Sequence, residues 1–427
     1  MRTKYKILTT AIFSIVAFSA CRDIIYEKGY RNVPVYMTYE ELRGAVAAFP
    51  ASDLKNPGKI YFKDGYIFIN EEMKGVHIID NRDPSAPVNI GFIAIPGNMD
   101  IAVKGSTLYA DSYVDLVAVD ISDLSAPEEA FRITDVFPYT LPPLADETLP
   151  IDKIEKENGV VTGWEVKLEN RRVETHYFPV YRGGWFGSKY DYADMSANTG
   201  QESGSSFGIG GSMARFGLND RYLYAVDDRQ LHIFDIEDET QPVLVSEPFL
   251  NQQTETIFIH DNNIFLGTRS GMMVYSLSDP ANPRYKASFP HIYSCDPVVV
   301  QDHTAYVTLR GGNECGNTVN RLDIYSLSSD YDNAVSQYSY NMTEPYGLGI
   351  DDEILFVCDG VKGLLIYDAS DISDIDAHQL AAFSDIKAYD VIPFDDHLFM
   401  IGDDGFYQYD YSDIHDIHEI SRIPVNR

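Results

Sequence analysis

The chain repeats one short phrase of alternating apolar and polar positions seven times, usually closed by an aspartate. Alternation over five or six residues is typical of a strand, because successive side chains point to opposite faces. We therefore interpret each copy as a half-buried strand. The seven copies are GVHIID (75–80), DLVAVD (115–120), QLHIFD (230–235), MMVYS (272–276), RLDIYS (321–326), GLLIYD (363–368) and GFYQYD (405–410).

The spacing of these phrases predicts the architecture. Their last residues are 40, 115, 41, 50, 42 and 42 positions apart, so the period is about 41 with two enlarged units. Each phrase is preceded by two further apolar runs separated by a polar turn rich in Asp, Gly and Asn, and is followed by a loop and a fourth run. Four strands per unit in seven units predict an all-β, seven-bladed β-propeller over residues 55–427.

The repeated unit also resembles a known family. The typical unit has a Gly, a Val or Leu, an Ile and an Asp, followed by a loop such as NRDPSAP (81–87) or LSDPANP (277–283). This pattern resembles the LVIVD repeat, a family of bacterial propellers that are mainly secreted or lipid-anchored. The resemblance covers about residues 55–427 apart from one insertion, and it implies a fold but no chemistry. Two phrases end in Ser276 and Ser326, so we interpret the closing aspartate as a turn-capping residue rather than a ligand.

The amino terminus predicts export. Residues 1–20 hold Arg2, Lys4 and Lys6, an apolar run and small residues, which is typical of a signal peptide. Small residues before Cys21 resemble a lipobox, which implies that Cys21 becomes the lipidated first residue of an outer-membrane lipoprotein. Ordinary cleavage near Ala20 is the alternative. We expect the membrane to be reached through this anchor only, and the side of the outer membrane stays open.

Residues 21–54 form a short amino-terminal extension before the first repeat. Thr38 and Glu41 fit a capping box ahead of a helix over residues 40–49. Such a segment would seal the first blade against the last, because an open ring leaves unpaired strand edges. Whether residues 34–37 add a strand to a blade stays open.

One large insertion follows the second repeat, at about residues 139–208. Residues 159–180 alternate like a hairpin, and a tract rich in Gly and Ser follows. In a propeller this connection emerges on the same face as the loops between second and third strands, where we expect a partner or ligand to bind. The predicted binding residues are Trp164, Trp185, Phe186, Tyr190, Arg215 and Arg310, with an aromatic plug packed on the propeller as the equal alternative.

The cysteines suggest a disulfide on that face. Cys295 precedes a first strand and Cys315 lies in the enlarged loop of the same unit, and oxidising compartments favour pairing. A disulfide between Cys295 and Cys315 would contribute about 3 kcal/mol on the chain-entropy model. The competing pair is Cys315 with Cys358.

Charge and motifs exclude several classes of function. The net charge is −32, and it becomes −35 without the three basic residues of the signal, which argues against nucleic acid as a partner. No catalytic or cofactor-binding motif occurs, so we expect no cofactor and no resident metal. The DIHDIHE run (413–419) is interpreted as a solvated turn, and Asp100, Asp111 and Asp115 as turn residues rather than a calcium site.

Two functions remain from different classes. The first is a non-catalytic, lipid-anchored binding or assembly module that docks a protein partner or captures a glycan or peptide. Resemblance to lipoproteins of this type suggests an accessory subunit of an outer-membrane nutrient importer of the TonB-dependent class. The alternative is a propeller hydrolase or lyase acting on a glycan or peptide at the channel mouth, with His176 and His291 as the histidines nearest that face.

Overall fold

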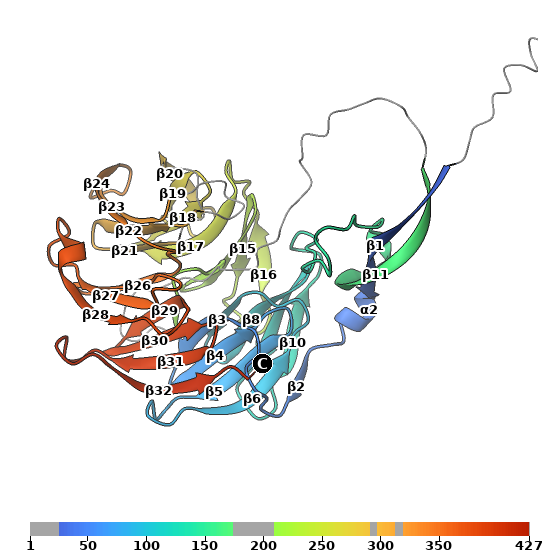
Figure 1. The fold of residues 1–427 in the computed structure, drawn as a ribbon, viewed down its shortest axis with the longest axis horizontal. Helices are drawn as coiled ribbons and strands as arrows, with labels where there is room; N and C mark the ends of the chain where they lie inside the picture. The colour runs from blue at the N-terminus through green and yellow to red at the C-terminus, as the bar shows by residue number, and fades with distance from the viewer. Residues whose placement is uncertain (1–24, 174–208, 291–296, 312–318, 427) are drawn as a thin grey trace, which may run out of the picture. The chain divides into compact units, whose positions relative to one another are not determined.

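The chain forms two compact units in the computed structural model, which describes residues 25–173, 209–290, 297–311 and 319–426. The propeller unit holds the described residues 36–143, 156–162, 209–290, 297–311 and 319–426. The ribbon unit holds residues 25–35, 144–155 and 163–173. Figure 1 colours the chain from one end to the other.

The propeller unit contains seven sheets, each built on four consecutive antiparallel strands, which confirms the predicted seven-bladed, all-β fold. Blades 1 to 4 are β3 Pro57–Lys63, β4 Tyr66–Glu71, β5 Gly75–Asp80, β6 Val88–Ala94; β7 Ile101–Lys104, β8 Thr107–Ser112, β9 Asp115–Asp120, β10 Glu128–Ile133; β13 Phe216–Asn219, β14 Tyr222–Asp227, β15 Gln230–Asp235, β16 Val243–Ser246; β17 Thr254–His260, β18 Asn263–Thr268, β19 Gly271–Ser276, β20 Arg284–Pro290. Blades 5 to 7 are β21 Val298–Gln301, β22 Thr304–Leu309, β23 Arg321–Leu327, β24 Ala334–Asn341; β25 Leu348–Asp351, β26 Ile354–Cys358, β27 Leu364–Asp368, β28 Gln379–Phe383; β29 Ala388–Phe394, β30 His397–Gly402, β31 Gly405–Asp410, β32 His418–Pro424.

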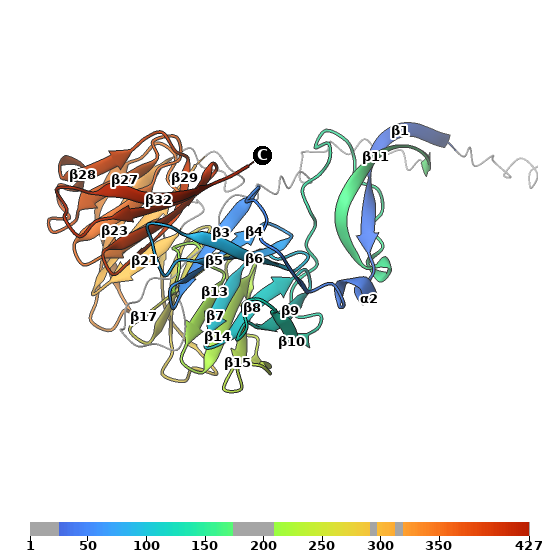
Figure 2. The ribbon, with the colours of Figure 1, turned by 90° about the horizontal axis from the view of Figure 1, so that it is seen from below.

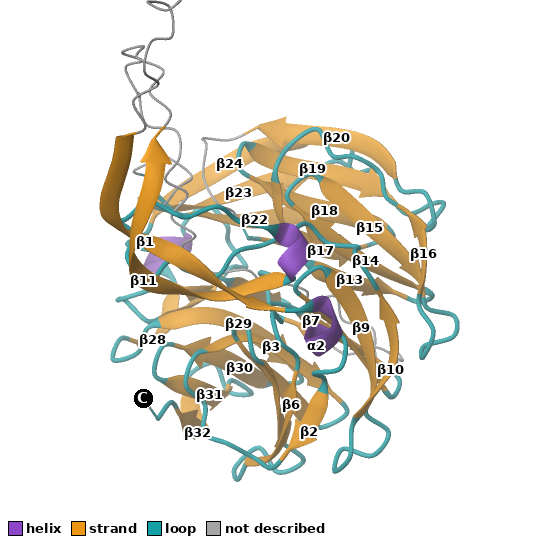
Figure 3. Cartoon of the chain, turned by 90° about the vertical axis from the view of Figure 1, so that its right-hand side faces the viewer, coloured by secondary structure: helices purple, strands orange, loops and turns teal. Residues whose placement is uncertain are grey.

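Among the four consecutive strands of each blade, the first lies nearest the centre of the propeller and the fourth lies at its rim. Figure 3 shows first strands such as β3, β7 and β17 gathered inside, and fourth strands such as β16 and β32 at the periphery. The third strands carry the repeated phrase, and every residue of β9 except the closing Asp120 is buried. The expectation of a half-buried strand is therefore wrong, because neighbouring blades cover both faces of the middle strands.

Tight turns join the first and second strands as the polar residues predict. In blade 7 the turn residues Asp395 and Asp396 both have positive φ, at 50° and 62°, which a type I′ hairpin turn requires. Asp and Asn tolerate this left-handed region better than most residues, because their short polar side chains bond locally. The Asp and Asn residues that mark these turns in the sequence are therefore the residues that can adopt the backbone angles the hairpins need.

The aspartates that close the repeated phrase are turn caps, as interpreted from the sequence. Asp120 Oδ1 accepts a hydrogen bond from the backbone N–H of Ser122 at 2.8 Å, and Asp410 accepts from Ser412 at 2.9 Å in the same way. These hydrogen bonds lower the pKa of Asp120. We call the face that carries these loops the turn face.

Blade 1 is larger than the others because two short strands extend it. β12 Ile209–Gly210 pairs with β3 on the inner edge, and β2 Ala47–Phe49 pairs with β6 on the outer edge. The predicted helix over residues 40–49 is therefore wrong in extent, since α2 spans only Tyr39–Leu42. The capping box is present, because Glu41 N–H donates to Thr38 Oγ1 and the Glu41 carboxylate accepts from Thr38 N–H.

The two ends of the propeller meet at a short seam. Leu54 and Val425 form a parallel bridge, and the N–H of Asn426 donates to the carbonyl of Leu54 at 3.0 Å. Leu54 is buried with apolar side chains of blades 1 and 7, among them Ile60 and Phe406. The end of the extension therefore seals the ring, but as a bridge and not as a strand shared between blades.

The ribbon unit is built on two strands, β1 Ile25–Met37 and β11 Val160–Val173, which pair with each other (Figure 2). The predicted hairpin within residues 159–180 is therefore wrong for β11, whose partner is β1, and residues 34–37 belong to β1 and not to a blade. Buried Asn32 holds the irregular stretch that precedes β11: its Nδ2 donates to the carbonyls of Asp146 at 2.7 Å and Leu149 at 3.1 Å. Two short 3₁₀ turns complete the described elements, η1 Lys156–Asn158 and η2 Ile375–Ala377.

Candidate binding face at the centre of the propeller

The face opposite the turn face is the one from which the insertion leaves and to which it returns. First strands begin there and second strands end there, and the insertion joins β10 to β13 on it. We call it the insertion face. Near its centre, each first strand offers one equivalent position, four residues before the strand's last residue. In chain order these residues are Lys59, Asp100, Arg215, Thr256, Pro297, Gly347 and Asp390.

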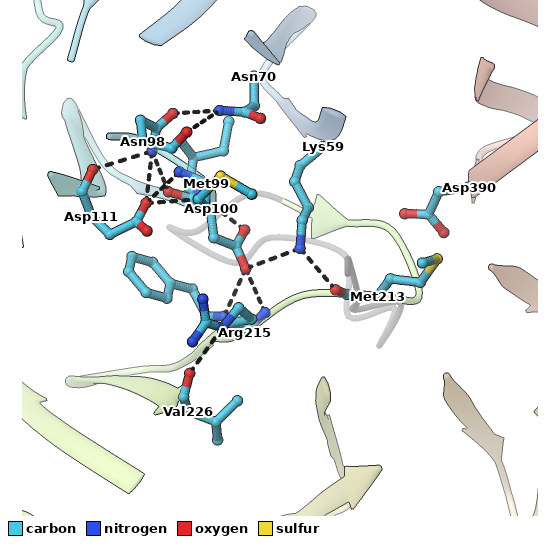
Figure 4. Close-up of polar contacts among 12 residues, drawn as sticks. Lys59, Asn70, Asn98, Met99, Asp100, Asp111, Met213, Arg215, Val226 and Asp390 are labelled. Atoms are coloured by element: carbon cyan, nitrogen blue, oxygen red, sulfur yellow. Dashed lines mark hydrogen bonds and ion pairs between the residues drawn. The ribbon is translucent and has the colours of Figure 1, made fainter. Parts of the chain in front are cut away.

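The chain's own residues 209–215, here called the return segment, lie across these strand beginnings. The Lys59 ammonium donates to the carbonyl of Met213 at 3.1 Å (Figure 4). On the side of blade 7, the N–H of Ser212 donates to Asp390 Oδ1 at 3.0 Å. The N–H of Leu348 in blade 6 donates to Ser212 Oγ at 2.5 Å. The return segment therefore bonds to blades 1, 6 and 7 before blade 3 begins.

Two glycines make this close approach possible. A Cβ on Gly211 would lie 2.1 Å from a carboxylate oxygen of Asp390, and a Cβ on Gly347 would lie 2.2 Å from the other oxygen. Any side chain at either position would displace the carboxylate. Gly211 and Gly347 are thus packing requirements at the centre of the insertion face.

A buried group of charges supports the return segment. Lys59 Nζ lies 3.8 Å from Asp100 Oδ2, and the same carboxylate accepts from the backbone N–H groups of Arg215 and Phe216. Burial lowers the pKa of Lys59 to about 8, although the Asp100 carboxylate opposes this shift. Burial also raises the pKa of Asp111, which accepts from the N–H groups of Met99 and Asp100.

Asp115 is a further buried carboxylate of this face. It lies at the start of β9 with no exposed side-chain area, and Arg43 Nε donates to it at 3.0 Å while Arg132 Nη1 donates at 3.1 Å. Arg43 follows α2, so this ion pair ties the amino-terminal extension to blade 2. Asp100, Asp111 and Asp115 each have separate protein partners.

A group of arginines occupies the insertion face over blades 3 to 5. Arg269 Nε donates to Glu255 Oε1 at 2.7 Å, and the Arg310 guanidinium lies 4.1 Å from the centroid of the Tyr346 ring. Arg215 starts blade 3, is half-buried, and donates from Nε to the carbonyl of Val226 at 3.2 Å. Burial raises the pKa of Glu255, although the charges of all three arginines oppose this.

An open cleft of about 400 Å³ lies on the same face between blades 6 and 7. Val361 and Ile386 line it together with Asp385, Asp403 and Lys387, and Val361 is 57% exposed. The cleft therefore combines apolar and charged side chains at the surface.

Several predicted residues lie outside the part of the chain that the structure describes. They are Cys21, Trp185, Phe186, Tyr190, Cys295 and Cys315, with His176 and His291 of the enzyme alternative. Trp164 is half-buried in β11 of the ribbon unit, and Cys358 is buried at the end of β26. Sequence reasoning identified Arg215 and Arg310, interpreted Asp100 as a turn residue, and missed Lys59 and the return segment. Lys59 and Asp100 occupy the equivalent first-strand position, where the residue type differs from blade to blade.

The described ranges hold no candidate metal site and no candidate membrane-spanning helix. They contain no group of three or more His, Cys, Asp or Glu side chains placed to hold a metal ion. Asp413 of the DIHDIHE run accepts from the N–H of His415 at 2.9 Å, as the other loops of the turn face do. No helix among these residues has the length and apolar character needed to cross a membrane.

Comparison with known proteins agrees with the geometry. The LVIVD repeat model matches residues 97–135 and 210–247, which correspond to blades 2 and 3. The fold and the matched repeats define the class: a seven-bladed β-propeller. More particularly, two of its blades carry LVIVD repeats.

Solved structures with a similar arrangement have little sequence in common with this chain. The computationally designed Ika8 protein has 7% identity and a TM-score of 0.49, over 87% of this chain and 89% of that one. BamB from Moraxella catarrhalis has 8% identity and a TM-score of 0.46, over 90% of this chain and 97% of that one. No curated protein matches the sequence.

Proposed function

We propose that this protein is a non-catalytic binding or assembly module of the cell envelope, held at the outer membrane by a lipid on Cys21. Its insertion face would dock a protein partner, as an accessory subunit of a nutrient importer of the TonB-dependent class. The fold and the LVIVD repeats support a binding module, and the lipobox-like residues before Cys21 support the anchor.

The return segment is the observation that carries this proposal. Propeller enzymes need convergent acids, bases or metal ligands near the central axis. Here the chain's own backbone occupies that place, and Asp100 and Asp390 accept hydrogen bonds from backbone N–H groups. Carboxylates held in this way support a closed surface for docking rather than a reaction cavity.

Gentle detergent extraction of the native protein tests the proposal. We expect a membrane transporter or companion lipoproteins to co-purify, and mass spectrometry to find an acylated Cys21 peptide. Gly211→Gln, which displaces Asp390, should reduce the co-purified partner, whereas Asp120→Ala on the turn face should not. A protein that emerges alone, or a partner retained equally by Gly211→Gln, would contradict the proposal.

The enzyme alternative makes a different prediction for the same preparation. A hydrolase or lyase would cleave glycans or peptides without any partner, and substitution of a single acid at the centre would abolish turnover. Turnover by the isolated protein that Asp390→Asn abolishes, with folding intact, would replace the assembly proposal.

A further inference from the structure

The ribbon unit carries a strand edge to which a further strand can add. Strands β1 and β11 pair with each other, and within the described ranges residues 165–169 of β11 have no second strand beside them (Figure 2). A two-stranded sheet alone is at best marginally stable in water, and an unpaired strand edge is a template for another strand. The edge at the middle of β11 is therefore a candidate interaction surface.

The side chains along this edge are divided between two faces. Alternate residues of a strand point to opposite faces. Val166 and Leu168 share one face, and they are 44% and 47% exposed. Glu165 and Lys167 share the other face, where they form an ion pair with each other, and more than half of each side chain is exposed. The edge thus carries apolar groups on one face and alternating charges on the other.

This pattern is complementary to itself. Two copies of β11 can lie side by side in antiparallel orientation about a two-fold axis at Val166, near the middle of the 14-residue strand. Glu165 of each copy then lies opposite Lys167 of the other, which makes two pairs of opposite charge. On the other face Val166 lies opposite its own copy, and Leu168 lies opposite the half-buried Trp164.

Neighbouring alignments of the same edge are less favourable. An axis at Lys167 would place Lys167 opposite itself and Glu165 opposite Glu169, and like charges directly opposite are destabilising. An axis at the following residue would set the apolar Val166 opposite the polar Asn170. The axis at Val166 joins opposite charges on one face and apolar residues on the other.

We propose that the protein forms a homodimer through the edge of β11, in which two ribbons join as one four-stranded sheet. The occupant of the edge is a second copy of this chain, because the charges of the edge match those of its own copy. The net charge of −32 does not prevent this at physiological ionic strength, where repulsion between exposed charges is screened beyond about 8 Å. The inference goes beyond the proposed function and does not rest on it, since it uses the ribbon unit and not the insertion face.

Sedimentation velocity of the full-length protein in detergent, from about 1 to about 100 µM at physiological salt, tests the dimer. We expect Lys167→Glu to raise the dissociation constant of the dimer about tenfold or more, because both cross-strand pairs become pairs of like charge. The double variant Glu165→Lys, Lys167→Glu restores opposite charges and should dimerise like the wild type. Lys153→Glu is the matched control, since Lys153 is an exposed lysine of the ribbon unit outside β11.

Two further measurements separate pairing from folding. Glu165→Lys and Lys167→Glu each repel their own copies, but a mixture of the two single variants pairs opposite charges at both positions and should form a heterodimer. Val166→Cys should cross-link under mild oxidation, because opposite residues of an antiparallel pair have Cα atoms about 4.5–5.5 Å apart, within the range of a disulfide. The wild type, which keeps the other four cysteines, is the control for this cross-link.

Several outcomes would overturn the inference. These are a monomer at every concentration, a dimer that Lys167→Glu leaves unchanged, a double variant that stays monomeric, and a mixture of single variants without heterodimer. Circular dichroism confirms that each variant is folded. None of these results alters the effect of Gly211→Gln on the partner that co-purifies, so failure of the dimer and failure of the assembly role are distinguishable.

Discussion

Aspartates that close the repeated phrase bond within their own blade, whereas Asp390 and Asp115 on the insertion face bond to distant parts of the chain. Asp120 and Asp410 each cap their own loop. Asp390 instead holds Ser212, 178 residues away in sequence, and Asp115 holds Arg43, 72 residues away. The repeated aspartates therefore stabilise loops within single blades. The unrepeated aspartates connect a blade to the amino-terminal extension or to the return segment. The contacts that distinguish this propeller from a simple repeat are therefore made by residues outside the repeated pattern.

The largest expected effect is at Asp115. Asp115→Ala leaves Arg132, whose side chain is only 7% exposed, and Arg43 without their shared carboxylate. Removing one partner of a buried ion pair costs about 3–5 kcal/mol. Urea unfolding followed by circular dichroism should show this loss in the free energy of unfolding. A loss below about 1 kcal/mol would mean that Asp115 is no more important than a turn-face aspartate.

Lys59 should make stability depend on alkaline pH. Its folded pKa of about 8 is below the unfolded value of 10.5, so between these values the unfolded chain binds more protons and stability rises with pH. The gain reaches about 3 kcal/mol at most. Unfolding of the wild type and of Lys59→Met at several pH values from 7 to 10 measures it, because the variant shares every other titrating group. Parallel pH profiles for the two proteins would contradict the prediction.

Glu71 gives an acid counterpart on the same face. Burial alone would raise its pKa, but hydrogen bonds from His77, the Lys55 N–H and Lys74 outweigh burial and lower the pKa to about 2. The stabilisation is complete above pH 4.5 and is lost as the pH falls from there towards 2. We expect the wild type to lose about 2 kcal/mol over this range relative to Glu71→Gln. Acid unfolding curves that stay a constant distance apart would refute this.

The smallest effect is expected on the turn face. Asp120→Ala removes an exposed hydrogen bond to Ser122 within one loop, and such local bonds contribute below about 1 kcal/mol. Thermal unfolding of Asp120→Ala and of Asp115→Ala compares the turn face with the insertion face within one blade, because both residues belong to strand β9. Comparable losses at the two positions would show that the two faces do not differ energetically.

Much of the propeller was predictable because each blade is specified locally. Strand alternation, the Asp and Asn turns and the closing aspartates all act within about 40 residues, and all are visible in the sequence. The alternating pattern of residues 160–173 also predicted a strand within the insertion. Its partner β1 was not, because pairing between strands far apart in sequence leaves no periodic signal.

The candidate site was less accessible to sequence reasoning. Arg215 and Arg310 could be placed on the insertion face by counting strands, but the role of Gly211 depends on a carboxylate at position 390. The short helix has a similar cause: Ala47–Phe49 pairs with β6, and tertiary pairing outweighs the helix preference of alanine. The repeat pattern in the sequence therefore predicts the blades, but not the long-range contacts made by residues outside the repeats.

The six-stranded sheet of blade 1 also has a consequence for the order of events during synthesis. Blades 2 to 7 can complete their sheets soon after their last strand leaves the ribosome, because their four strands are consecutive. Blade 1 begins at Pro57, but its inner strand arrives only with Ile209 and its bridge to Leu54 only with Val425. Blade 1, the first to be made, is therefore finished only with later parts of the chain, and its inner edge stays open to chaperones until residues 209–210 have been made.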